Sequence, residues 1–119
     1  MSSISCIIVS FNNEMYLKKA ISSVLEQSMR VNEIIITDDG STDGSREIIR
    51  SFANQYSILR PIFREKNLGV AANRDLAVRV ATSHLITTLD GDDYYFPNKI
   101  ENEYLALEAG GDVAFSNAV

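Results

Sequence analysis

The stretch "ISCIIVSFNN", residues 4–13, begins with an apolar run and then turns abruptly polar. A short apolar run without alternation is typical of a strand in a parallel sheet that is covered on both faces. The polar residues after it are then expected at the carboxyl end of that strand, along one edge of the sheet. These ten residues therefore favour a parallel α/β protein with polar loops at its strand ends.

The rest of the chain alternates strand-like runs with apolar residues at helical spacing. The elements expected, in order, are strand 4–9, helix 13–29, strand 33–37, a helix through 48–53, strand 57–63, helix 70–81, strand 84–89, a helix with Pro97 in its first turn, and strand 112–116. Pro61 indicates that strand 57–63 lies at an edge or is irregular. This order predicts an α/β fold, with an open, mainly parallel, Rossmann-like sheet, right-handed crossovers and helices on both faces.

Length and composition are those of one ordinary globular domain, with 119 residues, of which 45% are hydrophobic and 23% charged. The net charge of −5 argues against a nucleic-acid partner, which would need clustered Lys and Arg. The single cysteine, Cys6, excludes an internal disulfide or a multi-cysteine zinc site, and its apolar surroundings predict a buried strand residue. His84, the only histidine, is expected at the amino end of its strand, away from any site.

Neither a signal peptide nor a membrane-spanning run is visible, so a cytoplasmic location is expected, with membrane association left open for a longer form. The chain stops at Val119, directly after an apolar run and without a helix to cover it. We therefore expect residues 1–119 to be a domain truncated at its C-terminus. Truncation would leave a sheet edge or a core face exposed, through which a homodimer could form in solution.

An acidic cluster follows the fourth predicted strand, at the edge of an open parallel sheet where ligands usually bind. Asp90, Asp92 and Asp93 lie within four residues and repel one another. A divalent cation would offset this repulsion, and carboxylate oxygens suit Mg²⁺ or Mn²⁺. The alternative is a solvated acidic turn in which Asp92 or Asp93 caps the next helix.

A second acidic segment, "DDGSTDGS" at 38–45, follows the second predicted strand. Gly40 permits a tight turn there, and Asp39 could accept hydrogen bonds from a base or a sugar. The alternative is that Asp38 and Asp39 only make hydrogen bonds within the turn. One of the residues 41–43 is expected to cap the helix that follows.

Four segments in a fixed order resemble the nucleotide-binding half of the family 2 glycosyltransferases, which have the GT-A fold. They are "CIIVSFNN", "IIITDDGSTDGS", "NLGVAANRD" and "TTLDGDDYYFPNKIE". The resemblance covers nearly the whole chain and implies the N-terminal, nucleotide-sugar-binding portion of such an enzyme. It further implies a nucleoside diphosphate sugar as donor, most commonly a UDP-sugar, Mn²⁺ or Mg²⁺ as cofactor, and inverting transfer to a saccharide or lipid-linked acceptor, as in polysaccharide biosynthesis.

The resemblance also implies roles for particular residues. Val9 and Phe11 would line the nucleobase, with the Phe11 ring against it, and Asp39 would accept a hydrogen bond from the base. Asn67 and Arg74 would contact the nucleotide or its diphosphate. The family often has a Pro and a Tyr where this chain has Val9 and Phe11, a change that keeps the stacking ring and loses a phenol hydroxyl.

In the acidic cluster, the resemblance implies that Asp90 lies on the ribose side and that Asp92, with Asp93, holds the cation. The cation would offset the charge that develops on the leaving diphosphate. No catalytic residue is assigned. The later acids, Glu101, Glu103 and Glu108, fall into a helical pattern and are interpreted as its solvated face, so the catalytic base is expected beyond residue 119.

Two other classes of α/β protein place acids at strand ends. A phosphotransfer receiver domain would have its acidic pair after the first strand, whereas here the pair follows the second. A dehalogenase-type phosphatase would have its acidic motif on an early strand, followed by Thr or Val, whereas here Asp93 occupies that position. Both classes fit the order of acids less well and are kept as alternatives to the glycosyltransferase interpretation.

Overall fold

Four parallel strands form the sheet at the centre of the structure, a computed structural model in which residues 3–108 are described. The strands are β1 (Ile4–Ser10), β2 (Glu33–Asp39), β3 (Leu59–Arg64) and β4 (Leu85–Asp90). Their order across the sheet is β3-β2-β1-β4, and every pairing is parallel. This arrangement confirms the predicted fold class, while the strand expected at 112–116 lies outside the described residues.

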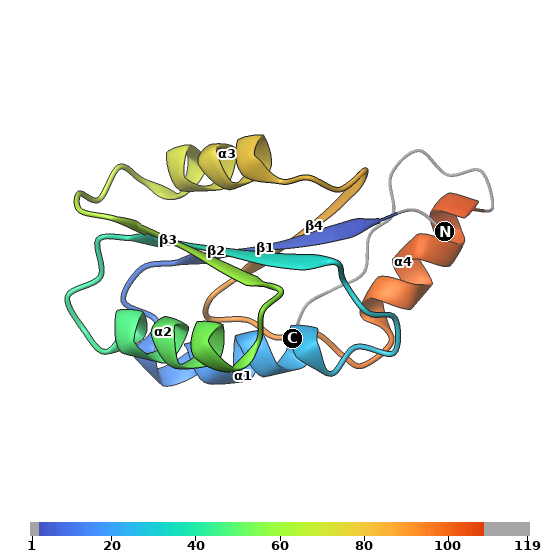
Figure 1. Ribbon diagram of the computed structural model, residues 1–119, viewed down its shortest axis with the longest axis horizontal. Coiled ribbons are helices and arrows are strands. Elements are labelled where there is room, and N and C mark those ends of the chain that lie inside the picture. The colour runs from blue at the N-terminus through green and yellow to red at the C-terminus, as the bar shows by residue number, and fades with distance from the viewer. Residues whose placement is uncertain (1–2, 109–119) are drawn as a thin grey trace.

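Helices cover both faces of the sheet, as predicted. They are α1 (Glu14–Leu25), α2 (Ser45–Gln55), α3 (Val70–Val80) and α4 (Lys99–Glu108). Among the described helices, α3 alone lies on one face, and α1 and α2 lie side by side on the other (Figure 1). Every residue of β1 and β2 is buried because both faces of these two strands are covered, which explains their unbroken apolar runs.

The two faces of the sheet bury separate hydrophobic clusters. On the α1 and α2 side, Ile8 and Ile36 pack with Ile21 of α1 and Ile100 of α4. On the α3 side, Ile7, Val9 and Ile35 pack with Ala77. Because side chains alternate along a strand, neighbouring residues at each strand end face opposite sides, and this alternation decides which of them reach the site.

Three predicted boundaries were wrong. Helix α1 ends at Leu25 and not at residue 29, because the chain turns to meet a distant segment: Ser28 N donates to Pro97 O at 2.7 Å. Strand β2 continues through Asp39, where a turn was expected, because Asp38 and Asp39 stay in register with β3. Pro97 precedes α4 and is not in its first turn, since the helix begins at Lys99.

Other predictions about single residues were confirmed. Pro61 lies in β3, an edge strand of the described sheet. Cys6 is fully buried in β1, and burial raises the pKa of its thiol to about 12. His84 precedes β4, at the amino end of the strands. None of the helices within residues 3–108 has the length and apolar character needed to cross a membrane.

A buried carboxylate, Glu33, joins several elements at the amino end of the sheet. Its Oε2 accepts hydrogen bonds from Ser5 Oγ at 2.6 Å, from Thr82 N at 2.6 Å and from Thr82 Oγ1 at 2.9 Å. Its Oε1 accepts from Arg60 Nη1 at 2.7 Å. Burial alone would raise the pKa of Glu33, but these four hydrogen bonds outweigh it and lower the pKa to about 2.

Candidate functional site

A cavity of about 250 Å³ lies at the carboxyl ends of β1, β2 and β4, beside the start of α3. Five of the residues predicted for the site line it: Val9, Phe11, Asp39, Asp90 and Asp92. They come from segments that are up to 83 residues apart in the sequence, and the parallel sheet brings them to one edge.

A larger cavity, of about 690 Å³, lies at the opposite end of the sheet. The ends of α1 and α2 form it together with Val31, Phe52 and Tyr56. The acidic cluster lies at the smaller cavity, which also has an exposed aromatic ring, Phe11, in its wall. We therefore take the smaller cavity, at the carboxyl ends, as the functional site.

The loop after β1 is fastened to the loop after β2 by hydrogen bonds in both directions. Asn12 N donates to Ser41 Oγ at 2.9 Å, and Thr42 N donates back to Asn12 Oδ1 at 2.9 Å. Asn13 N donates to Ser45 Oγ at 3.0 Å. The side chains of Ser41 and Ser45 in "DDGSTDGS" therefore hold the loop that carries Phe11.

The start of α2 is arranged differently from the prediction. Its N-cap residue is Gly44, without a side-chain cap, so the expectation that a residue within 41–43 would be the cap was wrong. Asp43 still contributes, because its Oδ1 accepts from Ser45 N at 2.9 Å and its Oδ2 from Glu14 N at 3.1 Å. Burial would raise the pKa of Asp43, but these hydrogen bonds hold it below its usual range.

Asp38 and Asp39 have different surroundings because they face opposite sides of the sheet. Asp38 is fully buried on the α1 and α2 side, where it pairs with Arg46 at 3.2 Å and accepts from Ser10 Oγ at 3.1 Å. This side chain holds the rim together and does not line the cavity. Its hydrogen bonds agree with the alternative in which this residue only supports the turn.

Asp39 lies on the α3 side and lines the cavity, although its side chain is already in use. Its two oxygens accept from Leu68 N and Gly69 N, each at 2.9 Å. These bonds hold the loop between β3 and α3 against the end of β2. A carboxylate oxygen has more than one lone pair, so Asp39 retains capacity to accept from a ligand.

Three predicted residues do not line the cavity. The Asn67 side chain is exposed, and its Oδ1 accepts from Gly69 N at 3.1 Å. Arg74 pairs through Nη2 with Asp90 Oδ1 at 3.0 Å, so it lies beside the acidic cluster with its side chain 40% exposed. Asp93 belongs to that cluster and is half-buried, but it does not line the cavity.

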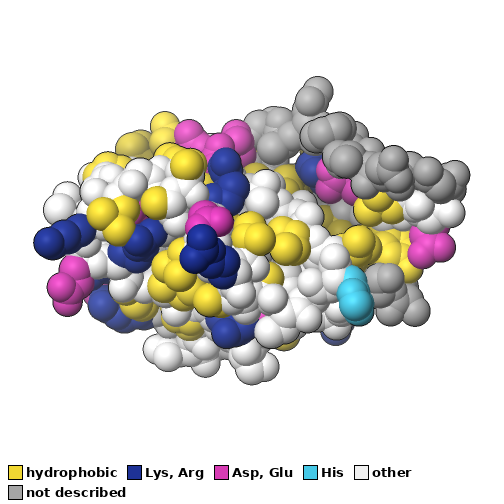
Figure 2. Space-filling view, turned by 90° about the horizontal axis from the view of Figure 1, so that it is seen from above, with side chains coloured by type: hydrophobic (Ala, Val, Ile, Leu, Met, Phe, Trp, Pro, Cys, Tyr) yellow, Lys and Arg dark blue, Asp and Glu magenta, His cyan; other side chains and the backbone are white. Residues whose placement is uncertain are grey.

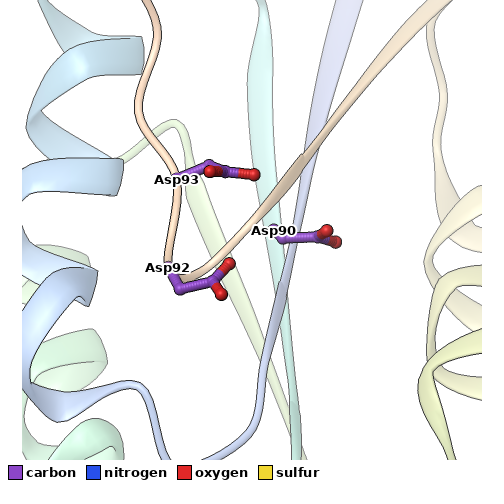
Figure 3. A group of neighbouring side chains, drawn as sticks. All are labelled: Asp90, Asp92 and Asp93. Atoms are coloured by element: carbon purple, nitrogen blue, oxygen red, sulfur yellow. The ribbon is translucent and has the colours of Figure 1, made fainter. Parts of the chain in front are cut away.

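The three acids at the end of β4 form a compact group. Asp90, Asp92 and Asp93 each offer a carboxylate oxygen, and these three oxygens lie within 4.8 Å of one another. Asp92 and Asp93 point from the loop toward Asp90, whose own carboxylate points toward the α3 side (Figure 3). Burial, together with the charges of Asp92 and Asp90, raises the pKa of Asp93. Three carboxylates beside one guanidinium, that of Arg74, keep a net negative charge, and such a set of hard oxygen donors fits Mg²⁺ or Mn²⁺.

Sequence reasoning missed several residues of the cavity wall. Ser10, Asn13, Val70, Asn73 and Gly91 also line it. For Asn73 a signal was available, because it lies four residues before Ala77 on the buried face of α3. A polar residue on the apolar face of a helix marks either a buried hydrogen bond or a site.

The run Tyr94–Phe96 and the acids of α4 lie outside the cavity. Tyr95 is buried in the core whereas Phe96 is exposed, and burial raises the pKa of the Tyr95 hydroxyl. The interpretation of Glu103 as part of a solvated face was wrong, since its side chain is only 16% exposed and pairs with Lys99 at 2.6 Å. None of the later acids within residues 99–108 lines the cavity, so they offer no catalytic base there.

The face that carries α3 has no continuous basic surface (Figure 2). Lys and Arg side chains are separated there by acidic and hydrophobic ones. This distribution agrees with the net charge of −5.

Comparison with known proteins identifies the family. A family model described as "Glycosyl transferase family 2" matches residues 5–119. The chain belongs to glycosyl transferase family 2. The match confirms the family that the four sequence segments resembled, and it does not favour the receiver or phosphatase alternatives.

Curated relatives of this family 2 chain are considerably longer. The chain is 41% identical over 106 residues to the cholesterol galactosyltransferase of Borreliella burgdorferi, a match that covers 89% of the chain and 29% of that protein. It is 35% identical over 115 residues to glycosyltransferase GlyG of Streptococcus pneumoniae, which covers 96% of the chain and 38% of that protein. The chain thus spans less than half the length of either relative.

Solved structures share the fold of this family 2 chain at lower identity. Residues 1–349 of S. aureus TarS in complex with UDP-GlcNAc match with a TM-score of 0.81 and 24% identity, over 90% of this chain and 31% of that one. The mannosyltransferase PcManGT from Pyrobaculum calidifontis, in complex with GDP-Man and Mn²⁺, matches with a TM-score of 0.79 and 20% identity, over 87% and 31%. These likenesses confirm the fold.

Proposed function

We propose that residues 1–119 form the donor-binding portion of a glycosyltransferase and hold a nucleoside diphosphate sugar in the cavity at the carboxyl ends of the strands. The observation that carries the proposal is the meeting of an exposed ring, Phe11, a carboxylate acceptor, Asp39, and the acidic cluster around Asp92 in one cavity. The ring can stack on the base, the carboxylate acceptor can bind N–H or hydroxyl groups of the base or a sugar, and the acidic cluster can hold the cation that the diphosphate needs.

The base occupies the part of the cavity between β1 and α3. Val9 contributes an apolar wall, and Phe11, with 42% of its surface exposed, offers a ring face for stacking. Asp39 accepts a hydrogen bond from the base with the lone pairs that its two backbone contacts leave free. Asp90, at the end of β4, lies on the ribose side.

The diphosphate lies nearer to the acidic cluster, where a divalent cation makes the approach of two negatively charged groups possible. Asp92, with Asp93, would hold Mn²⁺ or Mg²⁺, which would act as a Lewis acid and offset negative charge on the leaving diphosphate. Arg74, beside Asp90, donates charge-assisted hydrogen bonds to the nucleotide or its phosphates. Asn67 contacts the nucleotide from the loop before α3.

We propose UDP as the nucleotide and inverting transfer as the reaction. Support for UDP comes from TarS, whose structure holds UDP-GlcNAc. PcManGT, whose structure holds GDP-Man and Mn²⁺, supports a nucleoside diphosphate sugar and a divalent cation but not the choice of UDP. The acceptor is a saccharide or a lipid-linked sugar, and the enzyme works in the cytoplasm or at the cytoplasmic side of a membrane. Because no acid of residues 99–108 lines the cavity, we expect this chain alone to bind the donor without transferring its sugar.

Calorimetry with UDP tests the proposal directly. The 119-residue chain is titrated with UDP in the presence and in the absence of Mn²⁺, and we expect binding that requires the metal. The Asp92→Asn variant should lose the metal-dependent part of UDP binding. Asp75→Asn is the matched control, because Asp75 is an exposed acid that pairs with Arg79 on α3. If UDP does not bind folded protein under either condition, the donor site is refuted; if Asp92→Asn binds normally, the metal role is refuted.

A further inference from the structure

Buried polar atoms without a partner gather on one side of the sheet. In residues 3–108, four buried side-chain atoms lack a hydrogen bond: Thr37 Oγ1, Arg64 Nη1, Asn73 Oδ1 and Arg74 Nε. Thr37 and Arg64 lie two residues after Ile35 and Ile62, which pack toward α3, so both face the α3 side. Asn73 and Arg74 belong to α3 itself. An unsatisfied buried polar atom is costly, so their grouping calls for a cause.

Asn73 differs from the other three because it lines the functional cavity. The residue is only 1% exposed, and its Nδ2 donates to the Thr37 carbonyl at 3.0 Å. A carbonyl oxygen can only accept, so this bond fixes which end of the amide is the donor and leaves Oδ1 as a free acceptor. The side chain is therefore held in place with an acceptor to spare, at the wall shared with Asp39.

The neighbouring acceptor is already occupied in part. Both oxygens of Asp39 accept backbone N–H groups at 2.9 Å, whereas Asn73 Oδ1 accepts none. A ligand group placed between β2 and α3 with an N–H to donate would therefore satisfy Asn73 Oδ1 and could share the same hydrogen with Asp39. Phosphate oxygens cannot serve, because at neutral pH they only accept. The group has to come from the base or a sugar hydroxyl, and the base is the part that fills this end of the cavity in the function proposed above.

We propose that Asn73 is a specificity-determining residue: its Oδ1 accepts a hydrogen bond, alongside Asp39, from the ring N–H of a uracil-type base. This inference rests on the proposed nucleotide site and adds a residue to it. Cytosine has no hydrogen on the corresponding ring nitrogen, so it could satisfy Oδ1 only with its exocyclic amino group, which lies at a different position on the ring. Asn73 thereby favours uracil over cytosine.

The test compares UDP binding by the wild-type chain, by Asn73→Ala and by a matched control, Asn32→Ala. The Asn32→Ala substitution also removes a side-chain amide, but at the opposite end of the sheet, where Asn32 Oδ1 accepts a hydrogen bond from Ile4 N at 2.8 Å. We expect Asn73→Ala to bind UDP about tenfold more weakly with Mn²⁺ present, equivalent to about 1.4 kcal/mol, and the control to bind within about twofold of wild type. If Asn73→Ala does not fold, Asn73→Leu keeps the volume and removes the acceptor.

Competition with CDP completes the test. The preference of the wild type for UDP over CDP should fall by a similar factor in the Asn73 variant. Unchanged UDP affinity would overturn the inference, and would indicate that a buried water satisfies Oδ1 instead. An equal loss for UDP and CDP would also overturn it. In either case the nucleotide site itself would stand, whereas failure of the wild type to bind UDP would refute the proposed function.

Discussion

Acidification should destabilise the fold through one carboxylate, Glu33, at the end of the sheet opposite to the cavity. In the folded state this side chain accepts four hydrogen bonds, from Ser5, Thr82 and Arg60, and its pKa is lowered from 4.5 to about 2. A group whose pKa is depressed by folding contributes stability above its unfolded pKa. That contribution is lost as the pH falls from about 4.5 toward about 2.

The size of the effect follows from the difference between the two pKa values. Each unit of pKa difference between the folded and unfolded states is worth about 1.4 kcal/mol, so lowering the pKa from 4.5 to about 2 contributes about 3 kcal/mol to the free energy of unfolding. This contribution is large beside the total of about 5–15 kcal/mol that is usual for a domain. Because the side chain is buried, solvent screening reduces it little.

The assay is urea unfolding of the wild type, of Glu33→Gln and of the surface control Glu47→Gln, at several pH values between 7 and 2. Glu47 is a suitable control because its side chain is 78% exposed and pairs only with Arg50 on the same helix. We expect Glu33→Gln to lose most of the 3 kcal/mol at pH 7 and to depend less on pH between 5 and 2. Parallel curves for Glu33→Gln and the wild type would refute the reasoning.

Three further substitutions have defined outcomes. Gly40→Ala should lower the free energy of unfolding by about 1–2 kcal/mol in thermal or urea unfolding. Gly40 has φ +82, and an added Cβ would lie 3.3 Å from three backbone atoms of the loop before α3. Gly69→Ala should cost less, because Gly69 has φ +97 but open space around it. Arg74→Gln should weaken UDP binding with Mn²⁺ about tenfold in calorimetry while Arg50→Gln leaves it unchanged, and equal affinities would contradict the role of Arg74. Tyr95→Phe should cost about 1 kcal/mol in urea unfolding without changing UDP affinity, since its hydroxyl hydrogen-bonds to β4 and lies outside the cavity.

The sequence predicted those features that depend on burial of whole strands and helix faces. Strands β1 and β2 each contain an unbroken apolar run because both of their faces are covered, so these runs indicated a parallel sheet without further information. The boundaries that were wrong depend on long-range contacts. Ser28 leaves the helical path to donate to Pro97, 69 residues away, and no local pattern encodes that bond.

Within the site, the sequence indicated which segments meet but not which side chains remain free. Asp38 and Asp39 look equivalent in "DDGSTDGS", and only the continuation of β2 through both residues sends one into the core and the other to the cavity. Arg74 was expected at the nucleotide, and its pairing with Asp90 depends on how α3 lies over the sheet. Asn73 could have been noticed as a polar residue on a buried helix face, although its unsatisfied oxygen is a property of the folded structure.

The central claim is that the cavity at the carboxyl ends of the strands binds a nucleotide. A ¹⁵N NMR titration of the 119-residue chain with UDP and diamagnetic Mg²⁺ tests it most directly, because it locates the ligand. The claim predicts saturable shifts centred on the amides of Phe11, Gly69 and Gly91, around the smaller cavity. Shifts centred instead on Val31 and Tyr56, at the larger cavity at the other end of the sheet, would contradict it.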